Sequence, residues 1–76
     1  MEITEFVKNF AAQFDETDES EFSAETPFRS VEEWSSLIAL SIIAMVDEEY
    51  SIKLTGDDIR KSTTISDIYE IVKSRL

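Results

Sequence analysis

The stretch Trp34-Ser35-Ser36-Leu37, followed directly by Ile38-Ala-Leu-Ser-Ile-Ile-Ala-Met-Val-Asp-Glu-Glu-Tyr50, decides how this sequence folds. An acidic segment without periodicity ends here, and an apolar segment of helical character begins. Serine is favoured at helix N-caps because its side-chain oxygen accepts a hydrogen bond from a free backbone N–H group of the first turn. The pattern therefore predicts a helix over residues 36–50, with Ser35 as its N-cap and Ser36 as its first residue.

The apolar residues of this helix cover more than one face. One set has the spacing of a core-facing stripe: Leu40, Ile43, Val46 and Tyr50, widened by Ala39 and Ile42. A second set lies outside this stripe: Leu37, Ile38, Ala44 and Met45, which share their sides with Ser41 and Glu48. A helix that is apolar beyond one stripe is either buried on two sides or contacts a partner. Both alternatives are open, with the long preceding loop as the internal cover.

Length and composition narrow the class of protein. A chain of 76 residues forms one domain, here residues 1–76, and buries only about 60% of the surface of its unfolded form. The chain contains neither Cys nor His, which excludes disulfides, thiolate metal sites and imidazole acid–base chemistry. One Gly and one Pro among many good helix formers favour helices joined by short connections over a turn-rich sheet.

The formal net charge of -10 opposes binding to nucleic acid or to anionic lipid and favours protein partners with basic surfaces. The apolar run at residues 37–46 is far shorter than the roughly 20 residues that span a bilayer. Glu2 and Glu5 open the chain where a signal peptide would carry basic residues. We therefore expect a cytoplasmic monomer that binds neither nucleic acid nor membrane.

Helical spacing predicts three further helices, at about residues 2–14, 56–61 and 65–75. The first carries an apolar stripe that we assign to the core, because a row of phenylalanines at this spacing is rarely a ligand site: Ile3, Phe6, Val7, Phe10, Ala11 and Phe14. The second and third begin with the spacing of a capping box, in Thr55 with Asp58 and in Thr64 with Asp67. The last helix presents Ile65, Ile68, Tyr69, Val72 and Leu76 at helical spacing.

The connections also carry apolar residues. Residues 15–35 form a long acidic loop whose only basic side chain is that of Arg29. Structureless loops of this length are uncommon in compact domains, so we expect apolar side chains to pin it to the helices: Phe22, Phe28, Val31 and Trp34. The link after the apolar helix should bury Ile52 and Leu54, and the short helix should bury Ile59. The predicted fold is an all-α bundle of three longer helices and one short one.

This order of elements, with a serine at the head of the second helix, resembles the acyl carrier protein family. The resemblance covers essentially the whole chain: its size, its acidity, the long first loop, and the block from Trp34-Ser-Ser-Leu37 through Val46-Asp-Glu-Glu-Tyr50 to Thr64-Ile-Ser-Asp-Ile68. The family motif is usually Asp-Ser-Leu, and its serine carries 4'-phosphopantetheine. Position for position, that serine is Ser36, and the leucine after it is Leu37.

The resemblance implies a carrier of acyl or aminoacyl groups. A phosphopantetheinyl transferase would move the prosthetic group from coenzyme A to Ser36, and the group's own thiol would carry thioesters, which explains how a protein without Cys could do so. Enzymes that activate or transfer acyl groups would then be its partners, in a dedicated lipid, polyketide or nonribosomal peptide pathway. The carrier would have no catalytic residues and no metal site.

Two departures from the family pattern bear on partner recognition. Ser35 replaces the usual Asp, so a carboxylate that resembles part of the transferase's recognition site is missing. The first half of the apolar helix also lacks acidic side chains, which implies a docking surface more apolar than is usual in the family. We assign seven residues to that surface: Trp34, Ser35, Leu37, Ile38, Ser41, Met45 and Glu48. The alternative is a carrier-like interaction module without a prosthetic group, which binds a basic partner protein.

Overall fold

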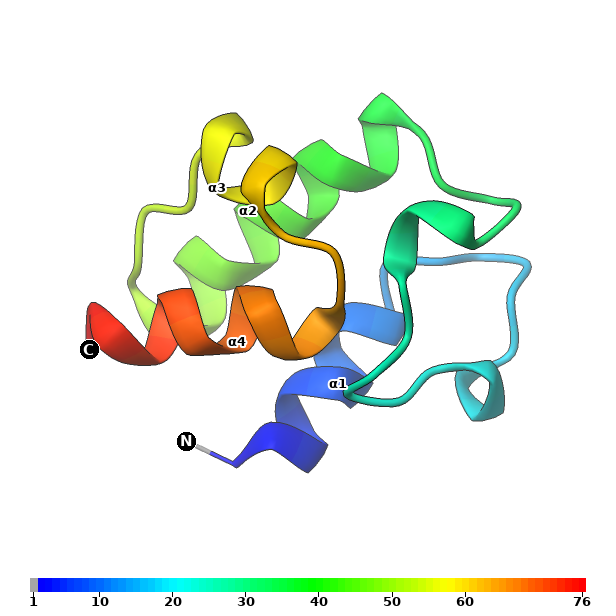
Figure 1. The fold of residues 1–76 in the computed structure, drawn as a ribbon, viewed down its shortest axis with the longest axis horizontal. Helices are drawn as coiled ribbons and strands as arrows, with labels where there is room; N and C mark the ends of the chain where they lie inside the picture. Colours follow the sequence, from blue (N-terminus) through cyan, green and yellow to red (C-terminus); the bar gives the residue numbers. More distant parts are fainter. Residues whose placement is uncertain (1) are drawn as a thin grey trace.

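The structure, a computed structural model that describes residues 2–76, is built from helices joined by irregular segments. Four α-helices and two short 3₁₀ turns follow one another along the chain: α1 (Ile3–Ala11), η1 (Glu19–Glu21), η2 (Phe28–Ser30), α2 (Ser36–Tyr50), α3 (Gly56–Lys61) and α4 (Ile65–Ser74). Figure 1 shows α2 crossing the molecule above α1 and α4, with α3 beside α2. The predicted all-α fold is confirmed.

The helix starts follow from side-chain caps that are local in sequence. Thr55 and Thr64 accept hydrogen bonds from the backbone N–H groups of Asp58 and Asp67, and the two carboxylates accept bonds from the N–H groups of the threonines. Both predicted capping boxes are therefore present. Each satisfies backbone donors that would otherwise lack a partner in the first turn.

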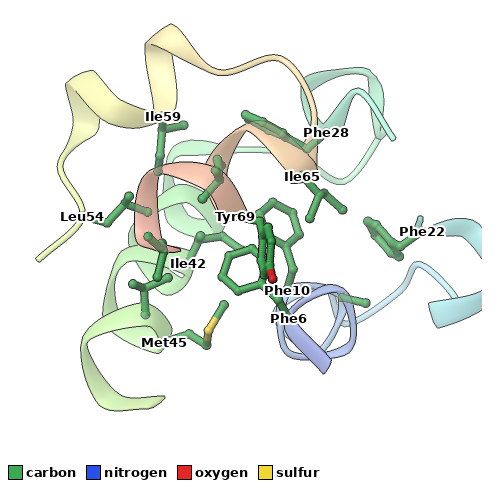
Figure 2. Packing of buried hydrophobic residues seen from close by; sticks show 14 of the residues in the cluster. Phe6, Phe10, Phe22, Phe28, Ile42, Met45, Leu54, Ile59, Ile65 and Tyr69 are labelled. Carbon is green, nitrogen blue, oxygen red and sulfur yellow. The ribbon is translucent and has the colours of Figure 1, made fainter. Parts of the chain in front are cut away.

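The core is formed mainly by aromatic side chains of α1 and aliphatic side chains of α2 and α4 (Figure 2). Phe6 lies at its centre, with ring centroids 5.7 Å from those of both Tyr50 and Tyr69. Asn9 Nδ2 donates to the hydroxyl of Tyr50 at 2.9 Å, which satisfies the polar tip of a ring that is otherwise packed. The assignment of the phenylalanine stripe to the core is confirmed.

The long first loop is held against the bundle by its aromatic residues, as predicted. Phe22 and Phe28 are buried, and Val31 and Trp34 pack against the core while partly exposed. Backbone pairing adds a second attachment, because the N–H groups of residues 65 and 66 donate to the carbonyls of residues 26 and 24 at 3.2 and 2.8 Å. The loop thereby supplies acceptors to the first turn of α4, which a helix cannot provide for itself.

Three details of the predicted helices are wrong. Leu40, assigned to the core-facing stripe, is 62% exposed. The buried face of α2 is instead centred on Ile42 and Val46, on the opposite side of the helix. The first helix ends at Ala11 instead of residue 14, because the chain turns there and brings Phe14 against the loop. The ring centroids of Phe14 and Phe22 lie 4.7 Å apart. Leu76 follows the end of α4 and is exposed, so it does not continue the apolar face of that helix.

Candidate functional site

The two adjacent serines at the start of α2 have different roles in the structure. Ser35 is the N-cap, in extended conformation, and its Oγ accepts a hydrogen bond from the N–H group of Ile38 at 3.3 Å. Ser36 is the first helical residue and is exposed. Among the hydrogen bonds of residues 2–76, none involves the Ser36 hydroxyl. The Ser36 oxygen is therefore free to react, whereas the Ser35 oxygen takes part in the helix cap.

The backbone around Ser36 favours an anion. Within the described chain, the N–H groups of Ser36 and Leu37 form no hydrogen bond with protein, in contrast to those at the start of α4. Such free donors, together with the positive end of the helix dipole, stabilise a negative charge by about 0.3–1 kcal/mol at an exposed site. A phosphate ester on the Ser36 oxygen would lie beside these donors.

An exposed apolar face continues along α2 from Ser36. Leu37, Leu40 and Ala44 recur at spacings of three and four residues and therefore lie on one side of the helix. Leu37 is 75% exposed, and with Leu40 it is one of the few large apolar side chains on the described surface. The carboxylates of α2 begin only at Asp47, so this apolar face has no acidic residue of its own helix beside it in the first turns.

The other residues assigned to the docking surface are distributed more widely. Ser35 and Glu48 are exposed on α2's surface, whereas Ile38 and Ser41 are half-buried. The ring centroid of Trp34 lies 4.9 Å from that of Phe28, and Trp34 remains partly exposed.

The assignment of Met45 to the docking surface is wrong, because its side chain is only 7% exposed and belongs to the core. The error has the same cause as that for Leu40. A helix with apolar residues on most of its circumference does not reveal from its own sequence which side will pack inward.

A groove lies beside Ser36, between α2 and α3. Its volume is about 390 Å³, near the lower end of the roughly 300–1,000 Å³ that is typical of ligand pockets. Apolar side chains line its sides: Trp34, Ala39, Leu40, Ile43 and Ile59. Ser36 also lines it, and the two basic side chains that line it are those of Arg29 and Arg60.

Arg29 fixes the loop to α3 and thereby shapes this groove. Its guanidinium donates to the carbonyl oxygen of Ile59 at 2.9 Å and to that of Ser62. These carbonyls lie at the C-terminal end of α3, where unpaired acceptors and the negative end of the helix dipole favour a cation. The guanidinium carbon also lies 5.0 Å from the centroid of the Phe28 ring.

The family to which the chain belongs follows from a comparison with known protein families. Residues 5–72 match the family described as the phosphopantetheine attachment site. The chain belongs to this family. Searches of curated proteins and of solved structures each returned no significant match. Members of this family carry covalently attached 4'-phosphopantetheine, so the resemblance inferred from residues 34–68 is confirmed for the family and for its cofactor.

As a carrier domain, this chain is expected to work with a phosphopantetheinyl transferase and with acyl-handling enzymes. The residues around its candidate site fit the prosthetic group, since an exposed hydroxyl, free backbone donors and a groove lie together. None of the described helices has the length and apolarity needed to cross a membrane.

Sequence reasoning missed the basic side chains of the groove. In the sequence, Arg29 is the sole cation of an acidic loop, and nothing in the local pattern indicates that it bonds to carbonyls about thirty residues away. Arg60 lies in the last turn of a short helix, where a basic residue is usually explained by its favourable interaction with the helix dipole alone. Glu33 was also missed, although its carboxylate accepts bonds from the backbone of Asp15 and Glu16 and closes the long loop.

Proposed function

We propose that this carrier domain holds acyl or aminoacyl groups as thioesters on 4'-phosphopantetheine attached to Ser36. The observation that carries the assignment is the contrast between the two serines: the Ser35 oxygen is engaged in the cap, and the Ser36 oxygen is exposed and has no hydrogen bond among the described residues. Ser36 is also the serine that the resemblance to the family motif, Asp-Ser-Leu, implies as the modified one.

In the attachment reaction, the Ser36 oxygen forms a bond to the phosphorus on the pantetheine side of coenzyme A as the P–O bond of the pyrophosphate breaks. The adenosine bisphosphate portion leaves, and the serine proton passes to a base of the transferase or to water. The free N–H groups of Ser36 and Leu37 favour the anionic phosphodiester that results. The prosthetic group supplies a terminal thiol, which this chain lacks.

We infer that partner enzymes dock on the surface formed by Trp34, Ser35, Leu37, Ile38, Ser41 and Glu48, extended by Leu40. Met45 is not included because it is buried. The net charge of -10 would accelerate encounter with basic partners, while the exposed Leu37 and Leu40 would supply the close contact. An apolar contact of this kind suits a narrow set of partners in a dedicated pathway more than the broad set of general fatty-acid synthesis.

Intact mass measurement tests the attachment site. The protein is incubated with coenzyme A and a promiscuous phosphopantetheinyl transferase, in parallel with Ser36→Ala and Ser35→Ala. We expect the mass of the wild-type protein to rise by one prosthetic group, the Ser36→Ala protein to remain unmodified, and the Ser35→Ala protein to be modified more slowly because its helix cap is lost. Modification of Ser36→Ala at the wild-type rate would place the attachment elsewhere.

A second candidate function is an interaction module that binds a basic partner without any prosthetic group. The exposed apolar face of Leu37 and Leu40 favours it, because this face exists whether or not Ser36 is modified. It predicts that the unmodified protein and Ser36→Ala bind the partner equally. A partner that binds only the modified protein would refute this function.

A further inference from the structure

We propose that Arg60, on α3, binds the phosphodiester of the prosthetic group and so positions the start of the arm beside Ser36. This inference rests on the proposed function, because it requires a phosphodiester on Ser36. It assigns to a residue of α3 a role in positioning the arm, separate from the residue that carries it.

The first support is the placement of positive charge in a strongly acidic protein. The chain has seven basic residues, and three of them are arginines. Two of those arginines line the same groove as Ser36, and no carboxylate lines it. With a net charge of -10, the protein repels anions over most of its surface, so this concentration of guanidinium groups makes the groove the favoured place for a phosphodiester beside Ser36.

The second support is that the two arginines differ in how firmly they are held. The guanidinium of Arg29 is engaged by the carbonyls of Ile59 and Ser62 and holds the loop to α3. Arg60 has a different environment: its side chain is largely exposed, and among residues 2–76 it forms an ion pair with Asp57 alone, one helical turn earlier. An exposed pair of this kind contributes little stability, so a phosphodiester can displace the Asp57 carboxylate from the Arg60 guanidinium or bind the guanidinium together with it.

The third support is chemical. A guanidinium presents several N–H donors in a planar fork that matches two oxygens of a phosphate group, which a lysine ammonium does not. Ser36 and Arg60 line the same groove, together with the apolar side chains of Ala39, Leu40 and Ile43. Arg60 therefore supplies a cation at this groove for the charged start of the arm.

The neighbouring residues provide matched controls. Lys61 is adjacent to Arg60, exposed and of equal charge, but does not line the groove, so Lys61→Gln changes the net charge as Arg60→Gln does. Asp57→Asn removes the ion pair with Arg60 while leaving the guanidinium in place. Arg60→Lys keeps the charge and removes the fork. All three substituted positions are exposed, so the fold should be retained.

The experiment uses each protein before and after modification, with loading verified by intact mass. The phosphorus resonance of the attached group is followed by NMR from low to high salt, and amide hydrogen exchange is measured in α3. In the wild-type protein we expect the resonance to shift with salt as the contact is screened, and α3 exchange to slow about 1.5- to 5-fold on modification, the fold-change that corresponds to an exposed ion pair.

Arg60→Gln should lose both effects, Arg60→Lys should lose most of the slower exchange, Lys61→Gln should keep both, and Asp57→Asn should strengthen them. Equal behaviour of Arg60→Gln and Lys61→Gln, or a wild-type resonance identical to that of Arg60→Gln, overturns the role of Arg60. Absence of any mass increase overturns the proposed function itself, and the two failures are therefore distinguishable.

Discussion

The guanidinium of Arg75 holds both carboxylate oxygens of Asp58, with Nη1–Oδ2 and Nη2–Oδ1 distances of 2.7 and 2.9 Å. Asp58 is buried, and its Oδ2 also accepts the N–H group of Thr55 at 2.9 Å as part of the cap of α3. One carboxylate thus links the start of α3 to the end of α4. Because α3 forms one wall of the groove beside Ser36, the contact between Arg75 and Asp58 also helps to fix the position of that wall.

Replacing Arg75 by Ala should lower the free energy of unfolding by about 1–2 kcal/mol, because Asp58 would remain buried without its main counterion. The exposure of part of the Arg75 side chain keeps the loss below that of a fully buried pair. Urea denaturation measures the change. Lys53→Ala breaks the exposed pair with Asp47 and should cost less than about 0.5 kcal/mol. Equal losses in the two variants would mean that burial of Asp58 has no energetic consequence.

The same contact should make stability depend on pH in the acid range. The hydrogen bonds from the Arg75 guanidinium lower the pKa of Asp58 below its ordinary value of 3.8. A lowered pKa in the folded state contributes stability that is complete above the unfolded value and is lost as the pH falls below about 4. The advantage of the wild-type protein over Asp58→Asn should therefore be constant near neutral pH and shrink below about pH 4. Urea titrations of both proteins at several pH values would reveal a pH-independent difference if this linkage were absent.

Arg29→Gln should loosen the attachment of the loop to α3. We expect the free energy of unfolding to fall by about 1–2 kcal/mol, because two carbonyls at the end of α3 lose a charged donor. Amide hydrogen exchange in α3 should accelerate even where the rest of the bundle is unchanged. Arg60→Gln is the control before modification, since its exposed side chain should leave stability within about 0.5 kcal/mol.

Ser51→Gly should stabilise the protein. Ser51 ends α2 with φ = 58° and ψ = 36°, the left-handed conformation that favours glycine. Relief of this strain should exceed the greater freedom of glycine in the unfolded chain and raise the free energy of unfolding by about 0.5–1 kcal/mol. Ser51→Ala keeps the Cβ atom and should give no gain. A gain in both variants would point to the lost hydroxyl instead of the backbone.

Leu37→Ala and Leu40→Ala should impair partner binding without affecting the fold, because both side chains are largely exposed. We expect the rate of transferase modification to fall by about tenfold for whichever residue the transferase contacts, equivalent to roughly 1.4 kcal/mol of lost contact. Leu76→Ala is the matched control: its side chain is 65% exposed, and Figure 1 shows the C-terminus far from the start of α2. Its modification rate should be unchanged.

Local features of the chain were predicted well because each depends on residues within one helical turn. The caps at Ser35, Thr55 and Thr64 define the starts of three helices as predicted. The phenylalanines of the first helix and of the loop were assigned to the core correctly, since large apolar side chains must find cover somewhere in a small domain.

What could not be predicted depends on contacts between distant segments. The inward side of α2 is an example: Leu40 and Met45 are both plausible core residues, and the choice between them is made by how α1 and α4 pack against the helix. Arg29 and Glu33 are further examples, because charged residues in loops usually face solvent and no local pattern distinguishes the few that bond across the fold. Arg60 bonds only within its own helix, but the packing of α3 beside α2 places it on the same groove as Ser36.

A helical domain with a serine at the head of α2 could be predicted from the order of residues, because caps and helical periodicity are properties of neighbouring residues, and the resemblance to the family added the expectation of a carrier. The exposed side of α2 and the groove with two arginines beside Ser36 became known from the folded structure alone. Those features arise where α2, α3 and the loop meet, and the rotation of one packed helix against its neighbours is determined by the fit of their side chains together.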